Sequence, residues 1–179
     1  MKLMIASDIH GSAKYCRELL EAYEKENADR LLLLGDILYH GPRNDLPEGY
    51  DPKQVIAMLN EKKNEIFAVR GNCEAEVDQA VLAFPVLADY ALLPLKERMI
   101  YVTHGHLYNR DHIPPMKKGD ILLHGHTHIP ACEEYDGYIY MNPGSVSIPK
   151  NGTSRGYMIL EEETFTWKTL EGEVYKTFA

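Results

Sequence analysis

Five short apolar runs in this chain each lead, within a few residues, to side chains that can bind a metal ion. In α/β proteins, ligand sites gather beyond the carboxyl ends of the strands. The five runs therefore predict strands whose ends meet at one composite site. The seven candidate ligands are Asp8, His10, Asp36, Asn72, His104, His126 and His128.

Capping signals between these runs predict two helices. Ser12 is suited to cap a helix whose apolar residues recur with the i, i+3, i+4, i+7 spacing of one buried face. Asp51 and Pro52 begin a second helix as N-cap and first helical residue. A weaker helical pattern covers residues 74–82. The run 31–34 is apolar without alternation, which is typical of a strand covered on both faces.

Beyond residue 98 the pattern changes to strands without long helices between them. The predicted strands cover residues 99–103, 121–123, 138–141, 156–160 and 164–170. Helices followed by strands favour an α/β (α+β) sandwich of two packed sheets with helices outside over one open sheet. At 179 residues, without repeats or a break in composition, the chain is expected to form a single domain over 1–179.

Charge and cysteine content argue against several classes of function. A formal net charge of -8 and a pI near 5.5 disfavour nucleic acid tracts and anionic membrane surfaces as partners, because both bind basic patches. No apolar run approaches the ~20 residues of a membrane span, and the apolar start is too short for a signal peptide. Three cysteines without Cys-x-x-Cys spacing fit a reducing compartment. We therefore expect a cytoplasmic protein.

The seven candidate ligands offer imidazole and oxygen donors and no thiolate, a set that suits manganese, iron or zinc. Seven ligands exceed what one tetrahedral ion takes, so we expect them to divide between two ions with Asp36 as the bridge. Each residue alone has a simpler explanation, because an Asp after a strand often caps a helix and a single His is more often structural. The pairs at i, i+2 spacing, Asp8 with His10 and His126 with His128, favour a metal site.

The ordered motifs of the chain resemble those of the calcineurin-like metallophosphoesterases. The motifs are Asp8-x-His10, Gly35-Asp36, Gly71-Asn72, His104-Gly105-His106 and Gly125-His126-Thr127-His128. Residues 35–44 and 142–150 resemble the small bacterial YfcE-type phosphodiesterases in particular. The resemblance implies a four-layer αββα sandwich, in which two mostly mixed β-sheets are flanked by helices. It also implies two ions whose ligand sets are Asp8, His10, Asp36 and His128 for one, and Asp36, Asn72, His104 and His126 for the other.

The function implied by the resemblance is that of a metal-dependent phosphodiesterase, a phosphoric diester hydrolase acting on small phosphodiesters. Two divalent ions ~3.5 to 4 Å apart share a hydroxide that attacks the phosphorus. Manganese is the expected ion, with iron, zinc, nickel and magnesium as alternatives, and members of the family often pair into homo-oligomers. A phosphomonoesterase and a non-catalytic interaction scaffold remain alternatives. The retromer subunit of this fold is such a scaffold, but it has lost part of its metal set, whereas all seven ligand positions are filled here.

Cys73 departs from the wider family, in which this motif continues Gly-Asn-His and the His is taken to protonate the leaving oxygen. With an unperturbed pKa of about 8.5, a thiol is a poor general acid for an alkoxide. The expected catalytic residues Asp36, Asn72 and Cys73 should therefore favour diesters with acidic leaving groups. A redox switch at Cys73 is the weaker alternative, because nothing in the sequence positions a resolving thiol.

Three further residues lie in the motif loops and are candidates for binding the phosphate. They are His40, Arg43 and His106, of which Arg43 offers a bidentate fork. For each of them, a substrate contact and a supporting or solvated position remain equally open. His112 and His124 are assigned to structure, because no motif places a ligand at either position.

Overall fold

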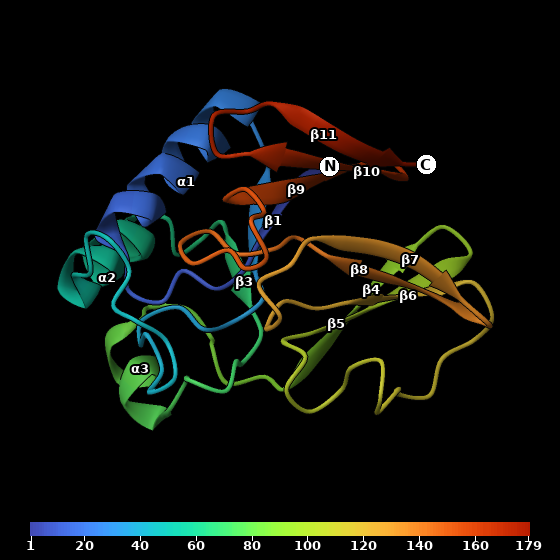
Figure 1. The fold of residues 1–179 in the computed structure, drawn as a ribbon, viewed down its shortest axis with the longest axis horizontal. Coiled ribbons are helices and arrows are strands. Elements are labelled where there is room, and N and C mark those ends of the chain that lie inside the picture. The colour runs from blue at the N-terminus through green and yellow to red at the C-terminus, as the bar shows by residue number, and fades with distance from the viewer.

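Two mixed β-sheets pack against each other in the computed structural model, which describes residues 1–179. The strands of the larger sheet are β1 (Lys2–Ala6), β2 (Arg30–Leu33), β3 (Ile66–Ala68), β9 (Gly156–Glu161), β10 (Thr164–Thr169) and β11 (Val174–Phe178). The strands of the smaller sheet are β4 (Tyr90–Leu95), β5 (Arg98–Thr103), β6 (Asp120–Leu123), β7 (Ala131–Tyr135) and β8 (Tyr138–Asn142). Figure 1 shows one sheet above the other, with both chain termini beside the larger sheet. The predicted sandwich of two sheets is confirmed.

The order of the strands gathers the candidate ligands. In the larger sheet the order is β11-β10-β9-β1-β2-β3, and β1, β2 and β3 run parallel. In the smaller sheet the order is β4-β5-β6-β8-β7, and β5, β6 and β8 run parallel. The carboxyl ends of parallel strands open on one edge of a sheet. The loops after β1, β2, β3, β5 and β6, which carry all seven candidate ligands, therefore lie at such edges.

The helices lie in the first half of the chain. They are α1 (Ala13–Glu26), α2 (Pro52–Glu61) and α3 (Glu76–Val81). Both predicted caps are confirmed, because the side chains of Ser12 and Asp51 each accept a hydrogen bond of 3.2 Å from a backbone N–H group of the first turn. The third helix is shorter than the pattern over 74–82 predicts, and it buries no side chain. None of the three helices has the length and apolar character that crossing a bilayer requires.

The strands β1 and β2 are buried on both faces, which explains their unbroken apolar sequences. Met4, Leu31 and Leu33 pack with residues of α1 and α2 in one hydrophobic cluster. Ile5 and Leu32 belong to a second cluster, which fills the space between the two sheets. Alternate side chains of a strand point to opposite faces, so each of these strands contributes to two cores.

The outer face of the smaller sheet is covered by a loop. Residues 104–119 connect β5 to β6 without a helix. Tyr108 and Met116 of this loop pack on a cluster that includes Tyr101 and Tyr140 of the sheet. The helical layer of the sandwich thus lies against the larger sheet, as Figure 1 shows for α1 and α2. On the smaller sheet, a loop takes the place of the second helical layer that the αββα sandwich predicts.

Glu26, at the end of α1, ties this helix to the larger sheet. Its carboxylate accepts hydrogen bonds from Lys2 on β1 (2.9 Å), Tyr157 on β9 (3.0 Å) and Lys168 on β10 (2.5 Å). Burial alone would raise the pKa of Glu26, but the three donors outweigh burial and hold the pKa below its ordinary value. The carboxylate is therefore stabilised in its charged form.

We expect Glu26→Gln to lower the free energy of unfolding by about 1–2 kcal/mol at neutral pH. A carboxylate whose pKa is depressed in the folded state stabilises the fold above its unfolded pKa, and this stabilisation is lost as the pH falls through the folded pKa. The difference between variant and wild type should therefore shrink below about pH 4. Urea unfolding at neutral and acidic pH measures this difference in the free energy of unfolding. Glu21→Gln, at an exposed position on the same helix, is the control. An equal difference at both pH values would contradict a contribution from charge.

Candidate metal centre

Five of the seven candidate ligands have a left-handed backbone. The residues and their φ angles are Asp8 (59°), His10 (49°), Asp36 (53°), His126 (65°) and His128 (61°). This conformation costs a residue other than glycine roughly 1–2 kcal/mol, and Asn, Asp and His tolerate it best. Such strain persists only where the surrounding structure holds it, and it gathers at functional sites. The ligand loops are therefore held in place by their surroundings.

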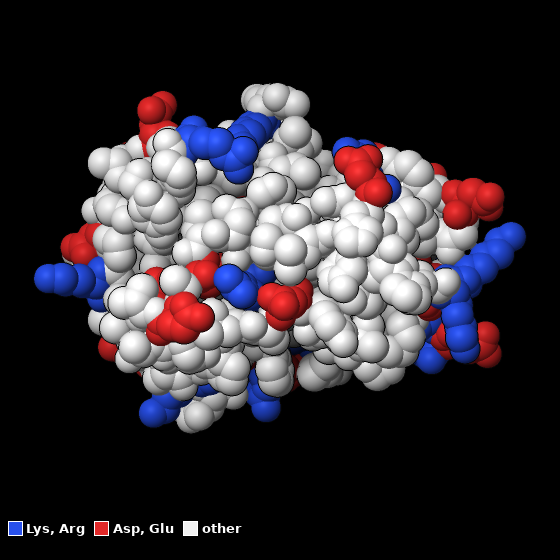
Figure 2. Space-filling view, turned by 90° about the horizontal axis from the view of Figure 1, so that it is seen from below, with Lys and Arg blue, Asp and Glu red and all other residues white.

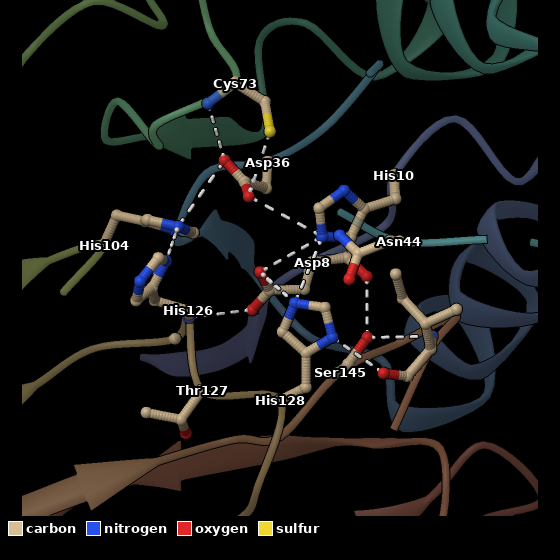
Figure 3. A network of polar contacts seen from close by, with 12 residues as sticks. Asp8, His10, Asp36, Asn44, Cys73, His104, His126, Thr127, His128 and Ser145 are labelled. Carbon is tan, nitrogen blue, oxygen red and sulfur yellow. Dashed lines mark hydrogen bonds and ion pairs between the residues drawn. The ribbon is translucent and has the colours of Figure 1, made fainter. Parts of the chain in front are cut away.

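Four of these side chains converge on a first point (Figure 3). The Oδ1 atom of Asp8 lies 3.3 Å from Nε2 of His128 and 3.5 Å from Nε2 of His10. The two Nε2 atoms lie 3.2 Å apart. The Nε2 atom of His10 also lies 3.6 Å from Oδ2 of Asp36. These four donors are the set that the resemblance implies for the first ion.

A second group of donors meets on the other side of Asp36. The Nε2 atom of His104 lies 3.5 Å from Oδ1 of Asp36. The same nitrogen lies 3.1 Å from Oδ1 of Asn72 and 3.1 Å from Nδ1 of His126. Asp36 thus directs Oδ2 toward His10 and Oδ1 toward His104, as Figure 3 shows. The structure brings all seven candidate ligands together, with Asp36 between the two groups.

The two groups of donors fit divalent metal ions. Ligand atoms about 2.0–2.2 Å from one ion lie roughly 3–3.6 Å from each other, and the pairs of atoms described above fall in this range. The Oδ1 atom of Asp8 is fully buried and has no hydrogen-bond partner, which is costly for a carboxylate unless a cation binds it. In each group two imidazole nitrogens face each other at 3.1–3.2 Å, and a cation between them satisfies both lone pairs.

Backbone carbonyl groups orient three of the imidazole rings. The Nδ1–H groups of His10, His104 and His128 each donate a hydrogen bond of 2.7–2.8 Å to a backbone carbonyl oxygen. These bonds fix the orientation of each ring, so its Nε2 atom points into the site. His126 differs, because its Nδ1 atom faces the site and its backbone N–H donates to Oδ2 of Asp8 at 3.0 Å.

Charge is divided unevenly among the ligands. Burial alone would raise the pKa of Asp8, but the imidazoles of His10 and His128, 3.5 and 3.3 Å from its Oδ1 atom, outweigh burial and hold the pKa well below its ordinary value. Burial alone would lower the pKa of His104, but the carboxylates of Asp36 and Asp8 raise it to about 9. Burial and the neighbouring His104 lower the pKa of His126 to about 4. Asp8 and Asp36 are therefore anionic, and His126 is a neutral donor.

The segment 142–150 supports the ligand loops from behind. The side chain of Asn142 donates a hydrogen bond of 2.8 Å to the carbonyl of Gly125. Two serine hydroxyls of the same segment donate to the carbonyl of Asp8 at 2.8 and 3.0 Å. A Cβ atom at Gly125 would lie 1.9 Å from the hydroxyl of Ser7, so this loop approaches too closely for any residue but glycine.

Glu74 is a buried acid to which the sequence analysis gives no role at the site. Its carboxylate accepts hydrogen bonds from the backbone N–H groups of Gly71 (2.6 Å), Asp36 (2.8 Å) and Ile37 (2.8 Å). Burial raises the pKa of Glu74. One side chain thus joins the loop that carries Asn72 to the loop that carries Asp36. Its signal in the sequence is its place directly after the Gly-Asn-Cys motif.

We expect Glu74→Gln to weaken metal binding ~10- to 100-fold, as the loss of a group that orients metal ligands does. A Gln side chain has one acceptor oxygen where the carboxylate has two, so at least one of the backbone donors loses its partner. Calorimetric titration with manganese measures the change, and Glu76→Gln at the exposed start of α3 is the control. Equal affinities for Glu74→Gln and wild type would contradict the supporting role.

A polar cleft of about 440 Å³ opens over the ligands. Its lining residues are Asp36, Arg43, Asn44, Asn72, His126, Thr127, His128 and Lys150. Of the three substrate contacts that the sequence predicts, Arg43 lines this cleft. The ring of His40 packs edge-on against Tyr50. The ring of His106 lies beside His104, with ring centres 5.5 Å apart. Neither of these two histidines is among the lining residues.

Three lining residues have no role in the sequence analysis. They are Asn44, Thr127 and Lys150. Asn44 and Lys150 fall in the stretches 35–44 and 142–150, and Thr127 lies between two ligands in the Gly-His-Thr-His motif. Membership in these motifs is the signal that could have found them.

Cys73 lies against the carboxylate between the two donor groups. Its backbone N–H donates to Oδ1 of Asp36 at 3.0 Å, and its thiol donates to Oδ2 at 3.3 Å (Figure 3). Burial raises the pKa of the thiol, and the charge of Asp36 raises it further. The thiol is therefore protonated and weakly acidic.

Comparisons with known proteins agree with this arrangement. Residues 1–164 match the family model described as the calcineurin-like phosphoesterase superfamily domain. The chain is 45% identical over 166 residues to phosphodiesterase YfcE of Escherichia coli K12, covering 93% of this chain and 90% of that protein. The solved structure of YfcE, a phosphoesterase from E. coli, superposes with a TM-score of 0.96 at 43% identity, over 100% of this chain and 99% of that one. Vps29 of Entamoeba histolytica, complexed with Zn²⁺, has the same fold, with a TM-score of 0.62 at 20% identity over 99% of this chain and 98% of that one.

Proposed function

The chain belongs to the calcineurin-like phosphoesterase superfamily, and from this membership we propose that it is a phosphodiesterase that hydrolyses small phosphodiesters with two divalent metal ions. The observation that carries the proposal is the presence of two donor groups on either side of Asp36. The relative from E. coli is named a phosphodiesterase, which favours diesters over monoesters as substrates.

Residues of the chain would hold and orient the two ions. One ion would be bound by Asp8, His10, Asp36 and His128, and the other by Asp36, Asn72, His104 and His126. When bound, two such ions supply Lewis acidity, which lowers the pKa of water and offsets charge on the phosphoryl oxygens. The strained loops and the hydrogen bonds behind the imidazoles keep the donors in place, so little reorganisation is needed during the reaction.

Two exposed cations, Arg43 and Lys150, position the ester. Both line the cleft that contains Asp36, Asn72 and His128. A guanidinium binds two phosphoryl oxygens side by side, and an ammonium binds phosphate as a point charge. We assign these two residues to the non-bridging oxygens of the substrate.

We expect Arg43→Ala and Lys150→Ala each to lower kcat/KM for a diester by ~10- to 100-fold, because each removes a charge-assisted hydrogen bond of roughly 1.5–3 kcal/mol. Metal affinity should stay as in the wild type, since neither residue is a donor. Steady-state kinetics and metal titration measure the two effects, with the exposed Lys118→Ala as the control. An unchanged kcat/KM in both variants would contradict this assignment.

The local charge of the cleft favours small anionic substrates. Figure 2 shows acidic and basic side chains interspersed on the face seen from below. The formal net charge is -8, so an anion is attracted by the cations of the cleft rather than by the molecule as a whole. Long nucleic acid tracts need a broad basic surface, and we therefore propose small diesters instead.

The donor set supports the choice of metal ion, and the free cysteines support the proposed compartment. Imidazole and oxygen donors suit manganese, which we propose as the activating ion, with iron, zinc, nickel and magnesium compared in the same assay. The three cysteines are free thiols, which suits a reducing cytoplasm.

Hydrolysis of two chromogenic esters tests the proposed function. The purified chain is assayed on bis(4-nitrophenyl) phosphate and 4-nitrophenyl phosphate, with manganese added or chelated, and its metal content is measured. We expect the diester to be hydrolysed faster, the activity to be lost on chelation and restored by manganese, and both donor groups to be filled. Faster hydrolysis of the monoester would make the chain a phosphomonoesterase. Bound metal without hydrolysis of either ester would favour the alternative function of a non-catalytic interaction scaffold.

A further inference from the structure

Three different donor atoms meet beside the bridging carboxylate, in addition to the two groups described above. They are the thiol sulfur of Cys73, Nε2 of His10 and Oδ2 of Asp36, which all lie within 4.8 Å of one another. The sulfur lies 3.3 Å and the imidazole nitrogen 3.6 Å from the same carboxylate oxygen. Figure 3 shows dashed lines from one carboxylate oxygen of Asp36 to both the thiol and the His10 ring.

A further buried carboxylate oxygen lies beside His10. The Oδ1 atom of Asp8 is fully buried and without a hydrogen-bond partner, and it lies 3.5 Å from Nε2 of His10. This oxygen belongs to the group of Asp8, His10 and His128, and not to the group that contains Cys73. The group beside Cys73 therefore offers three protein donors, one sulfur, one nitrogen and one oxygen, and a solvent molecule completes a tetrahedral shell.

The presence of sulfur decides which ions such a set prefers. Thiolates select soft or borderline ions such as Cd²⁺ and Zn²⁺, whereas manganese prefers oxygen and imidazole donors. We propose that Cys73, His10 and Asp36 form an alternative site for a thiophilic divalent cation. The proton of the thiol leaves to solvent as the sulfur–metal bond forms, and no electron is transferred.

The alternative site shares donors with the first ion of the proposed function. His10 and Asp36 belong to both sets, whereas Asp8 and His128 belong only to the set of the first ion and Cys73 only to the alternative one. One cation cannot satisfy both sets, so an ion held by the sulfur displaces the ion held by His128. Thiophilic ions should therefore inhibit the manganese enzyme, and this clause alone rests on the proposed function.

The other cysteines of the chain provide matched controls. Cys132 on β7 is partly exposed, as Cys73 is, and Cys16 is buried in α1. Neither of them belongs to a group of metal-binding side chains. A sulfur–metal bond at Cys73 can thus be distinguished from a bond at any other thiol by single substitutions.

Titration of the metal-free full chain with cadmium chloride tests the site directly. We expect an ultraviolet thiolate-to-cadmium absorption band that saturates with one sulfur bound per chain. The band should be lost in Cys73→Ser and retained in Cys132→Ser. Retention of the band in Cys73→Ser, or cadmium binding to the wild type without any such band, would overturn the proposal. The absorption measurement requires no enzymatic activity, so its result is independent of the test of the proposed function.

Inhibition of manganese-dependent diester hydrolysis tests the overlap of the two sites. Each variant is compared with its own uninhibited rate, first with cadmium and then with zinc. We expect Cys73→Ser to raise the concentration for half-inhibition at least ~10-fold, and Cys132→Ser to leave it as in the wild type. An unchanged half-inhibition concentration in Cys73→Ser, together with a cadmium band that depends on Cys73, would contradict the proposal that the two sites overlap.

Discussion

Asp36→Asn should lower the rate of diester hydrolysis at least ~1000-fold and reduce the number of bound ions, because it removes charge from both donor groups at once. Asp36 places one carboxylate oxygen toward His10 and the other toward His104. An Asn keeps the shape and tolerates the left-handed backbone of this position, but it offers one neutral oxygen. The measurements are steady-state kinetics with manganese and metal content per chain.

An exposed acid of the same loop, between β2 and α2, is the control for this effect. Asp45→Asn changes the formal charge by the same amount, and Asp45 does not line the cleft. Its rate and metal content should match the wild type. If Asp36→Asn kept its full complement of ions and more than about a tenth of its rate, the bridging role would be wrong.

Cys73→His should broaden the range of leaving groups that the enzyme accepts. A positioned imidazole contributes typically 10²- to 10⁴-fold as a general acid, whereas the wild-type thiol is held protonated by burial and by Asp36. We expect the rate of hydrolysis of diesters with alkyl leaving groups to rise ~10- to 100-fold. The change should be much smaller for nitrophenyl esters, because nitrophenolate leaves without protonation. Rates across a series of esters with rising leaving-group pKa measure this, as a flatter slope in the variant.

A second substitution separates acid catalysis from a change in the shape of the cleft. Cys73→Asn introduces a polar side chain that cannot donate a proton as an acid, so its slope should stay close to that of the wild type. Equal relative rates for Cys73→His and wild type across the series would refute a limit set by leaving-group protonation.

The centre of the fold could be predicted from the sequence, whereas three of its four edge strands could not. Strands such as β1 and β2 are covered on both faces and therefore appear as unbroken apolar runs. The strands β4, β7 and β11, for which the sequence analysis predicts nothing, are all edge strands. Edge strands tolerate charge and proline, as Glu133 and Glu134 in β7 and Pro94 in β4 illustrate. Their patterns therefore resemble those of loops.

The ligands of the candidate site could be predicted, but their supports could not. Metal binding requires particular donor side chains, and these appear in the sequence as motifs. Glu74 and Asn142 act on backbone N–H and C=O groups, which every residue possesses. Which of these groups come within reach depends on the packing of loops that are distant in sequence. Lys150 and Asp36 line the same cleft although they are distant in sequence, and only the fold brings them together.

The left-handed ligand loops determine which substitutions give interpretable results. An alanine at Asp8, Asp36 or His128 would remove a donor and also place an unfavoured residue at a φ angle near 60°. An alanine scan of these loops would therefore combine conformational destabilisation with loss of the ion and would overstate each side chain's share in chemistry. Asparagine and glycine adopt this backbone readily, so a comparison of these two residues separates the contributions.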